Sequence, residues 1–154
     1  MNNSLKLIIS LAIPQLVGGL GAIFTVPAVR GWYQTLNKPS WNPPDWLFGP
    51  AWTVLYVLMG IACFLIWKSN SPHKKNLLTF YGLQLFLNGV WSPAFFGLQN
   101  PLLGLLIIIP LWALILVCVL QFRKASMAAS VLMIPYLLWV TFATSLNAAI
   151  WWLN

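Results

Sequence analysis

Residues 101–122 read PLLGLLIIIPLWALILVCVLQF, a run that contains no charged side chain. An α-helix rises about 1.5 Å per residue, so about 20 residues are needed to cross a hydrocarbon core of about 30 Å. Strands of a membrane barrel would be shorter and would alternate apolar with polar residues. The run is long and continuous, and it therefore predicts a transmembrane α-helix.

Similar apolar stretches lie on both sides of this run, and together they predict an all-α membrane protein, a compact bundle of five transmembrane helices. The composition agrees, because 60% of the 154 residues are hydrophobic and 6% are charged, whereas roughly a quarter of a soluble domain's surface is charged. We expect a single domain over residues 1–154, with one long connection at 28–45. The expected helices are Leu5–Pro27, Trp46–Trp67, Leu77–Leu98, Pro101–Phe122 and Met127–Leu153.

The basic residues give the bundle a direction, because lysine and arginine gather on the cytoplasmic side of membrane proteins. Arg30 and Lys38 fall on one side of the bundle. The others fall on the opposite side: Lys6, Lys68, Lys74, Lys75, Arg123 and Lys124. We expect the N-terminus in the cytoplasm, and the C-terminus and the 28–45 connection outside. These residues stand in ones and twos between apolar runs, so the net charge of +7 does not indicate nucleic-acid binding.

Polar and aromatic residues inside three of the spans gather at one depth. At 1.5 Å per residue, Trp52, Trp91 and Asn147 each lie about 10 Å below the outer end of their span. A cavity there would suit a large, flat, mostly apolar ligand, but packing of the aromatic rings against one another explains them equally well. The residues that share these helix faces are Trp52, Tyr56 and Met59, then Asn88, Trp91, Ser92 and Phe95, and then Trp139, Ala143 and Asn147.

The remaining tryptophans have simpler interpretations. Five lie at segment ends, where an aromatic belt at the membrane interface explains them: Trp41, Trp46, Trp67, Trp151 and Trp152. Trp112 stands alone at mid-depth and faces either lipid or a partner subunit.

Small residues indicate where helices approach one another. The first span carries Gly18, Gly19, Gly21 and Ala22, which favour close packing, with room for a ligand as the alternative. Gly82 and Gly89 make the third span the expected dimer interface.

Few side chains could carry chemistry. Asp45 is the only acid and His73 the only histidine, and Cys63 and Cys118 are isolated in apolar runs. These residues cannot form a catalytic triad, an acid–base pair or a metal cluster inside the membrane, so we expect no metal site, no obligatory cofactor and no conventional enzyme. Asp45 directly precedes the second span, where its charge favours the helix dipole.

A further pattern covers nearly the whole chain. Residues 36–44 read LNKPSWNPP after the pair Trp32-Tyr33, and residues 52–56 read WTVLY, followed by Met59-Gly60. Later matches are Asn88, Trp91, Phe95-Phe96, Pro135-Tyr136, Trp139, Phe142-Ala143-Thr144 and Leu146-Asn147. In order and spacing these motifs resemble the TspO/MBR family, which comprises the bacterial tryptophan-rich sensory proteins and the mitochondrial translocator protein, or peripheral-type benzodiazepine receptor.

The resemblance implies a homodimeric five-helix bundle with a ligand pocket beneath the first long loop. Its implied ligands are protoporphyrin IX, haem, isoquinoline-carboxamide and benzodiazepine drugs, and in animals cholesterol. It also implies that Trp32 and Trp139 take part in light-dependent porphyrin breakdown. By positional match the pocket residues are Tyr33, Pro43, Trp52, Tyr56, Asn88, Phe95, Trp139, Ala143 and Asn147, to which the depth argument adds Trp91.

The expected function is therefore tetrapyrrole binding in porphyrin homeostasis or stress sensing, with transport of porphyrins or sterols across the membrane as the alternative. The animal sterol pattern, an aliphatic residue followed by Tyr and then Lys or Arg, is missing from residues 146–152, which read LNAAIWW. A loose copy at Val29, Tyr33 and Lys38 lies in a loop, so tetrapyrrole is favoured over sterol.

Overall fold

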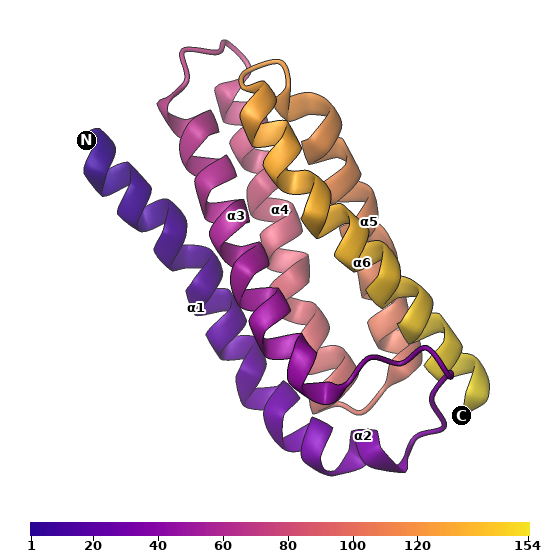
Figure 1. Ribbon diagram of the computed structural model, residues 1–154. Helices are drawn as coiled ribbons and strands as arrows, with labels where there is room; N and C mark the ends of the chain where they lie inside the picture. The colour runs from indigo at the N-terminus through magenta and orange to yellow at the C-terminus, as the bar shows by residue number, and fades with distance from the viewer.

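The computed structural model describes residues 1–154 and is built from helices alone. A 3₁₀ turn, η1, spans Asp45–Leu47, and a π-helical turn, η2, spans Pro93–Gly97. The long helices lie side by side along one axis, and the two termini lie at opposite ends of the bundle (Figure 1). The α-helices are α1 (Asn3–Arg30), α2 (Trp32–Thr35), α3 (Phe48–Lys68), α4 (Lys74–Ser92), α5 (Pro101–Phe122) and α6 (Met127–Leu153).

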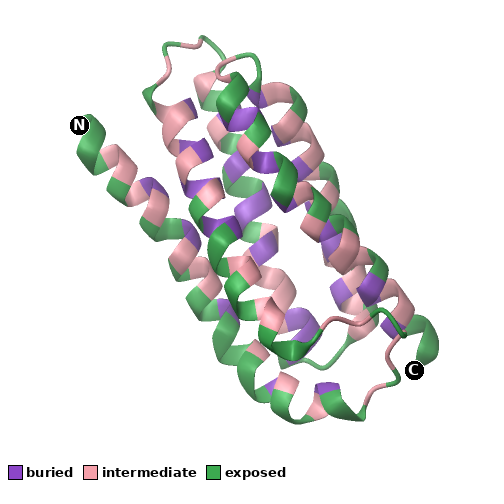
Figure 2. Ribbon diagram, viewed as in Figure 1, coloured by how far each residue is buried: buried purple, intermediate pink, exposed green.

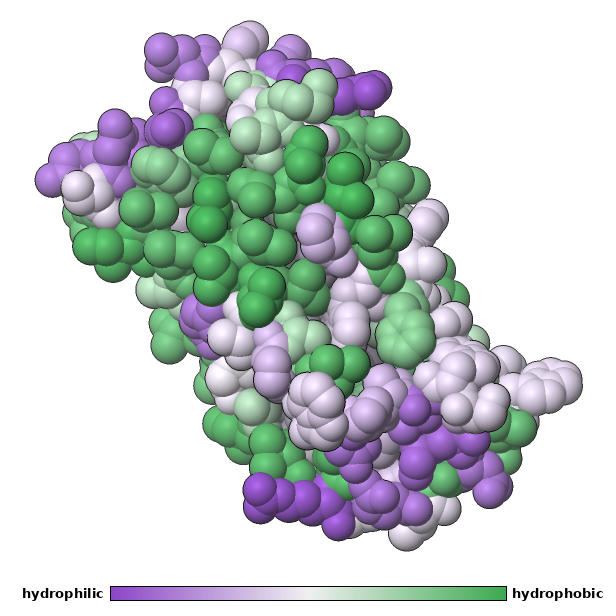
Figure 3. Space-filling view, in the orientation of Figure 1, coloured by the Kyte–Doolittle hydropathy of each residue, from purple (hydrophilic) through white to green (hydrophobic).

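The surface confirms the expectation of a multi-pass membrane protein. On the face drawn in Figure 3, apolar surface covers much of the middle of the bundle, and polar residues gather at the two ends. Four helices are long and apolar enough to cross a membrane, namely α1, α3 with η1, α5 and α6. The remaining predicted span, the third in the chain, corresponds to α4, which is 19 residues long and carries buried Gln84 and Asn88. The count of five spans therefore remains a prediction.

The connection predicted at 28–45 is partly helical, which corrects that boundary. Helix α1 runs through Pro27 to Arg30, and α2 follows directly after Gly31. A proline removes only one N–H donor and does not always end a helix, and the charge of Arg30 interacts favourably with the carbonyl end of α1.

The end of the third predicted span also differs from a plain α-helix. After Ser92 the chain forms η2, closed by the bond from the Leu98 N–H to the Pro93 carbonyl oxygen at 2.8 Å. Pro93 has no N–H, so the ordinary α-helical bond is lost at this position. The turn buries the consecutive side chains of Phe95 and Phe96.

Buried residues form two cores along the bundle, and Figure 2 marks the buried positions in purple on the ribbon. We call the end of the bundle that carries the 69–73 loop the inner end and the opposite end the outer end, as names for the two ends of the molecule only. The inner core lies toward the inner end and includes Met59, Ile66, Ile115, Phe122 and Met133, each fully buried. The outer core lies toward the other end: Ala28, Tyr33, Phe95, Phe96, Leu146 and Ile150.

Helix α1 packs against α3 through a close backbone approach at Gly60. A Cβ atom added there would lie 2.7 Å from the Ser10 carbonyl oxygen and 2.9 Å from Leu11 Cα, both backbone atoms of α1. Backbone atoms cannot move aside as the tip of a flexible side chain can. Only glycine therefore permits this helix contact.

We expect Gly60→Ala to lower the free energy of unfolding by about 1–3 kcal/mol, the usual cost of overpacking. Gly49→Ala on the same helix is the matched control, because a Cβ atom there meets nothing within 4 Å, and alanine in a helix is favoured by about 1 kcal/mol. Denaturant unfolding of purified protein in detergent, followed by circular dichroism, measures both. Equal stability of the two variants would contradict the close contact of α1 with α3.

Candidate ligand-binding cavity

A cavity of about 810 Å³ opens in the outer half of the bundle, between α1, α3, the end of α4 and α6. The predicted site residues that line its wall are Tyr33, Trp52, Tyr56, Asn88, Trp91, Phe95, Trp139, Ala143 and Asn147. Pro43 does not line it and instead borders a shallow groove with Pro50 and Leu138. Trp32 is also absent from the wall, and its ring meets the edge of Phe95 at 5.7 Å.

Helix α1 supplies part of the wall that the sequence analysis missed, including Gln15, Thr25 and Arg30. The only sequence signal for this wall was the run of small residues at 18–22. Both of its interpretations, close helix packing and room for a ligand, apply to different residues of the run. A Cβ atom at Gly18 would collide with the Tyr56 ring, and one at Gly21 would lie 3.2 Å from Ser92 Oγ, so these two glycines serve close packing. Gly19 meets nothing within 4 Å and borders the cavity.

Two of the amide side chains in the wall, Asn88 and Asn147, are hydrogen-bonded to partners inside the bundle. Tyr56 Oη donates to Asn88 Oδ1 at 2.8 Å, and Asn88 Nδ2 donates to Tyr136 Oη at 2.8 Å. Asn147 Nδ2 donates to the Pro101 carbonyl oxygen at 2.7 Å. Pairing removes the cost of burying these groups, so both amides first serve to join helices.

Tyr136 was quoted from the sequence as part of the family pattern but was not assigned to the site, although its side chain is fully buried. Its spacing was the available signal, because Tyr136, Val140, Ala143 and Asn147 recur at intervals of three and four residues and share one face of α6.

Aromatic rings cover much of the wall, and they contact one another as well as the cavity. Trp52 stacks on Tyr56 at 5.5 Å between ring centroids and meets Trp139 edge-on at 6.4 Å. Trp91 stacks on Phe95 at 5.5 Å and donates from Nε1 to Asn147 Oδ1 at 3.2 Å. The Nε1 atom of Trp139 is buried without a hydrogen-bond partner. Packing and pocket formation therefore involve the same rings.

The segment between α1 and α3 is fastened over the outer end of the cavity. Tyr33 is 2% exposed and donates from Oη to Asn42 Oδ1 at 2.7 Å. Burial, and then the negative charge of Asp45, raise the pKa of the Tyr33 phenol well above its ordinary value, so the phenol stays protonated as a donor. Lys38 Nζ donates to the Tyr33 carbonyl oxygen at 2.7 Å and lies 5.0 Å from the Tyr33 ring centroid.

Asp45 lies just before α3, so its expected contribution to the helix dipole stays a prediction, and the structure shows a further contact. It begins η1, and it accepts a bond from Gln34 Nε2 at 2.6 Å instead of capping α3. The same Gln34 nitrogen also donates to the Val29 carbonyl oxygen at 2.9 Å. Asp45 therefore ties the start of α3 to the turn after α1.

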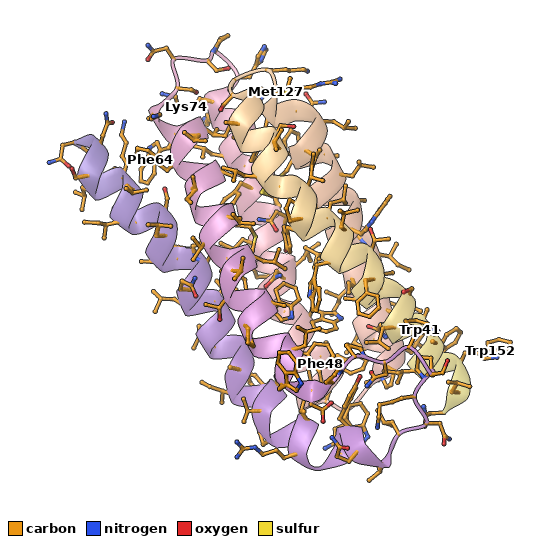
Figure 4. All side chains as sticks on the ribbon, in the orientation of Figure 1. Trp41, Phe48, Phe64, Lys74, Met127 and Trp152 are labelled. Atoms are coloured by element: carbon orange, nitrogen blue, oxygen red, sulfur yellow. The ribbon has the colours of Figure 1, made fainter.

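The exposure of the other tryptophans depends on where they lie along the bundle. Trp41, Trp46, Trp151 and Trp152 are exposed near the outer end, and Figure 4 shows Trp41 and Trp152 there with Phe48, opposite Lys74 and Met127. Trp67 is half-buried near the other end. Trp112 is half-buried and donates to Thr141 Oγ1 on α6 at 2.7 Å, which fixes its indole against a neighbouring helix.

The two glycines assigned to a dimer interface have different surroundings. A Cβ atom at Gly89 would lie 3.2 Å from Val17 Cγ1, so Gly89 packs against α1 of its own chain. Gly82 is exposed. Only the Gly82 side of α4 is available for a second subunit.

We expect Asn88→Leu to lower the free energy of unfolding by about 2–4 kcal/mol, because the buried Tyr56 and Tyr136 hydroxyls would lose their partner. Adding Tyr56→Phe and Tyr136→Phe to the same chain should recover part of that loss, because no polar group would then remain unpaired. Denaturant unfolding in detergent compares the variants. A triple variant less stable than Asn88→Leu would contradict the role assigned to this amide.

Comparison with known proteins places the chain in a family. The model of the TspO/MBR family matches residues 10–153. The tryptophan-rich protein TspO of Chlorobaculum tepidum is 46% identical over 142 residues, 90% of this chain and 89% of that one. The protein of the same name from Archaeoglobus fulgidus is 43% identical over 152 residues, 99% of each chain, and the translocator protein of Bos taurus is 35% identical over 142 residues, 90% and 84%. The chain therefore belongs to the TspO/MBR family.

Proposed function

We propose that this membrane protein binds a tetrapyrrole, protoporphyrin IX or haem, in the outer cavity and acts in porphyrin homeostasis or stress sensing. The observation that carries the proposal is the aromatic wall of the cavity, where Trp52, Trp91 and Trp139 lie among smaller residues. Aromatic faces attract a flat, apolar ligand by offset or edge-to-face contact. Isoquinoline-carboxamide compounds have the same flat, apolar character and are expected to occupy the same space.

The size and polarity of the cavity support this ligand class. Its volume of about 810 Å³ lies in the range of pockets that enclose drug-sized molecules, about 300–1,000 Å³. The wall amides are already paired within the protein, which leaves few groups that demand a polar ligand.

The membrane arrangement is part of the proposal. Helix α4 lies among the other long helices (Figure 1), and we propose that it crosses the membrane with them, giving five spans. The count of basic residues then puts the N-terminus in the cytoplasm and the cavity in the outer leaflet. A homodimer would use the face of α4 that carries Gly82.

Binding is favoured over transport by the packing of the inner half. Below the cavity, the inner core is filled by side chains from α3, α4, α5 and α6, including fully buried Ile66, Cys118 and Met133. A passage through this region would have to separate packed helices.

Filling the cavity should abolish binding. We expect protoporphyrin IX to quench tryptophan fluorescence of the purified protein at micromolar concentrations, and Ala143→Phe to weaken binding at least about tenfold, because the ring would occupy space between Trp139 and Asn147. The control is Ala128→Phe, an exposed position on the same helix. Unquenched fluorescence of the unmodified protein at tens of micromolar porphyrin would refute the proposal.

Light-dependent breakdown of a bound porphyrin should depend on Trp139, an indole in the cavity wall that can donate an electron to an excited ring. We expect Trp139→Phe to keep binding and to slow breakdown several-fold, whereas Trp152→Phe, which changes a residue that is 82% exposed, should not. Porphyrin absorbance under illumination at saturating ligand measures the rate without interference from affinity. An unchanged rate in Trp139→Phe would remove this residue from the mechanism.

A further inference from the structure

Charge is distributed unevenly around the cavity. The chain has eight lysine and arginine residues and one acid, and Arg30 is the one of these cations that borders the cavity. Lys38, the other cation at this end, is held by the carbonyl oxygens of Tyr33 and Leu36 at 2.7 and 3.3 Å. Arg30 is therefore the cation that a ligand in the cavity can reach.

The groups around Arg30 leave its guanidinium available. Asp45 also borders the cavity, but its carboxylate is bonded to Gln34 Nε2 at 2.6 Å. The bonds that fasten the loop run through Gln34, Lys38 and Asn42 and do not involve the Arg30 side chain. Arg30 lies in the last turn of α1 and is exposed, so its charge sits at the mouth, where an anionic group can keep partial contact with water.

We propose that Arg30 is a specificity-determining residue that binds a carboxylate of the ligand. The cavity would then select amphiphiles that combine a flat, apolar body with an acidic group at one edge, and would discriminate against neutral molecules of the same shape. A guanidinium suits this role because its donors match the two carboxylate oxygens. The inference rests on the proposed tetrapyrrole function and specifies the ionic state of the ligand.

The alternative role for Arg30 is purely structural, because a cation in the last turn of a helix stabilises the helix dipole. Arg123 provides the matched control. It directly follows α5 as its C-terminal cap residue, is exposed, and lies at the opposite end of the bundle from the cavity. A dipole effect would appear in both variants, and ligand recognition only in the Arg30 variant.

The test compares protoporphyrin IX with its dimethyl ester, which has the same ring and no carboxylate. The dissociation constant of each is measured by tryptophan quenching for the unmodified protein, Arg30→Gln and Arg123→Gln, in a neutral sugar detergent that contains no phosphate. The ratio of the ester constant to the acid constant is the readout. Partition of the two compounds into detergent is the same for all three proteins, so differences in the ratio belong to the protein.

We expect the ratio to fall about fivefold in Arg30→Gln, the upper range for a partly exposed ion pair, and to stay unchanged in Arg123→Gln. Added salt should reduce the ratio in the unmodified protein by screening. A ratio that Arg30→Gln leaves unchanged, or that both variants lower equally, would overturn the role of Arg30 while tetrapyrrole binding stands. Failure of both compounds to bind the unmodified protein would remove the proposed function together with this inference.

Discussion

Hydrocarbon offers no partner for an amide or a hydroxyl, so burying such a group inside this bundle is costly unless another helix supplies a partner. Asn88 of α4 meets this requirement by bridging Tyr56 of α3 and Tyr136 of α6. Asn147 bridges Trp91 of α4 and the first residue of α5, Pro101. These two amides together set the relative positions of four helices, and the cavity lies among the helices that they hold.

The cost of exposing polar groups to hydrocarbon also bears on α4, which is less apolar than the other long helices. Its buried Gln84 and Asn88 lower the hydropathy of the helix, yet both face other helices and are shielded from lipid by them. Gln84 Nε2 approaches Met59 Sδ at 3.9 Å, while its Oε1 is buried without a partner. A hydropathy criterion treats each helix as if it were alone in lipid, and it therefore undervalues a helix whose polar groups are buried against other helices.

The sequence was sufficient for features that depend on local pattern. The long helices follow from continuous apolar runs, and the shared faces of Trp52 with Tyr56 and of Trp139 with Asn147 follow from the period of a helix. The partners of the two amides were not predictable, because Asn88 and Tyr136 lie 48 residues apart in the chain. The turn η2 and helix α2 are short, and their stability depends on tertiary contacts, such as that of Tyr33 with Phe96 at 5.9 Å.

The contribution of α1 to the cavity was hidden for a related reason. This helix is apolar around its whole circumference, so its sequence does not mark which face points inward. Small residues at Gly18 and Gly21 let the Tyr56 and Ser92 side chains approach the α1 backbone, and Gly19 leaves its neighbourhood open. The sequence does not distinguish the glycines that pack against other helices from the one that borders the cavity, whereas the structure does.

The proposed ligand would make two kinds of contact in this cavity, one deep among the aromatic rings and one at the mouth. An unpaired charge deep among Trp52, Trp91 and Trp139 would lose its hydration without compensation, and the chain places none there. Its charged wall residues, Arg30 and Asp45, both lie at the outer end, where water remains within reach. In the proposed complex, dispersion and ring geometry would therefore act on the body of the ligand. Ionic selection would be confined to the mouth of the cavity, because only there can a charge keep part of its hydration.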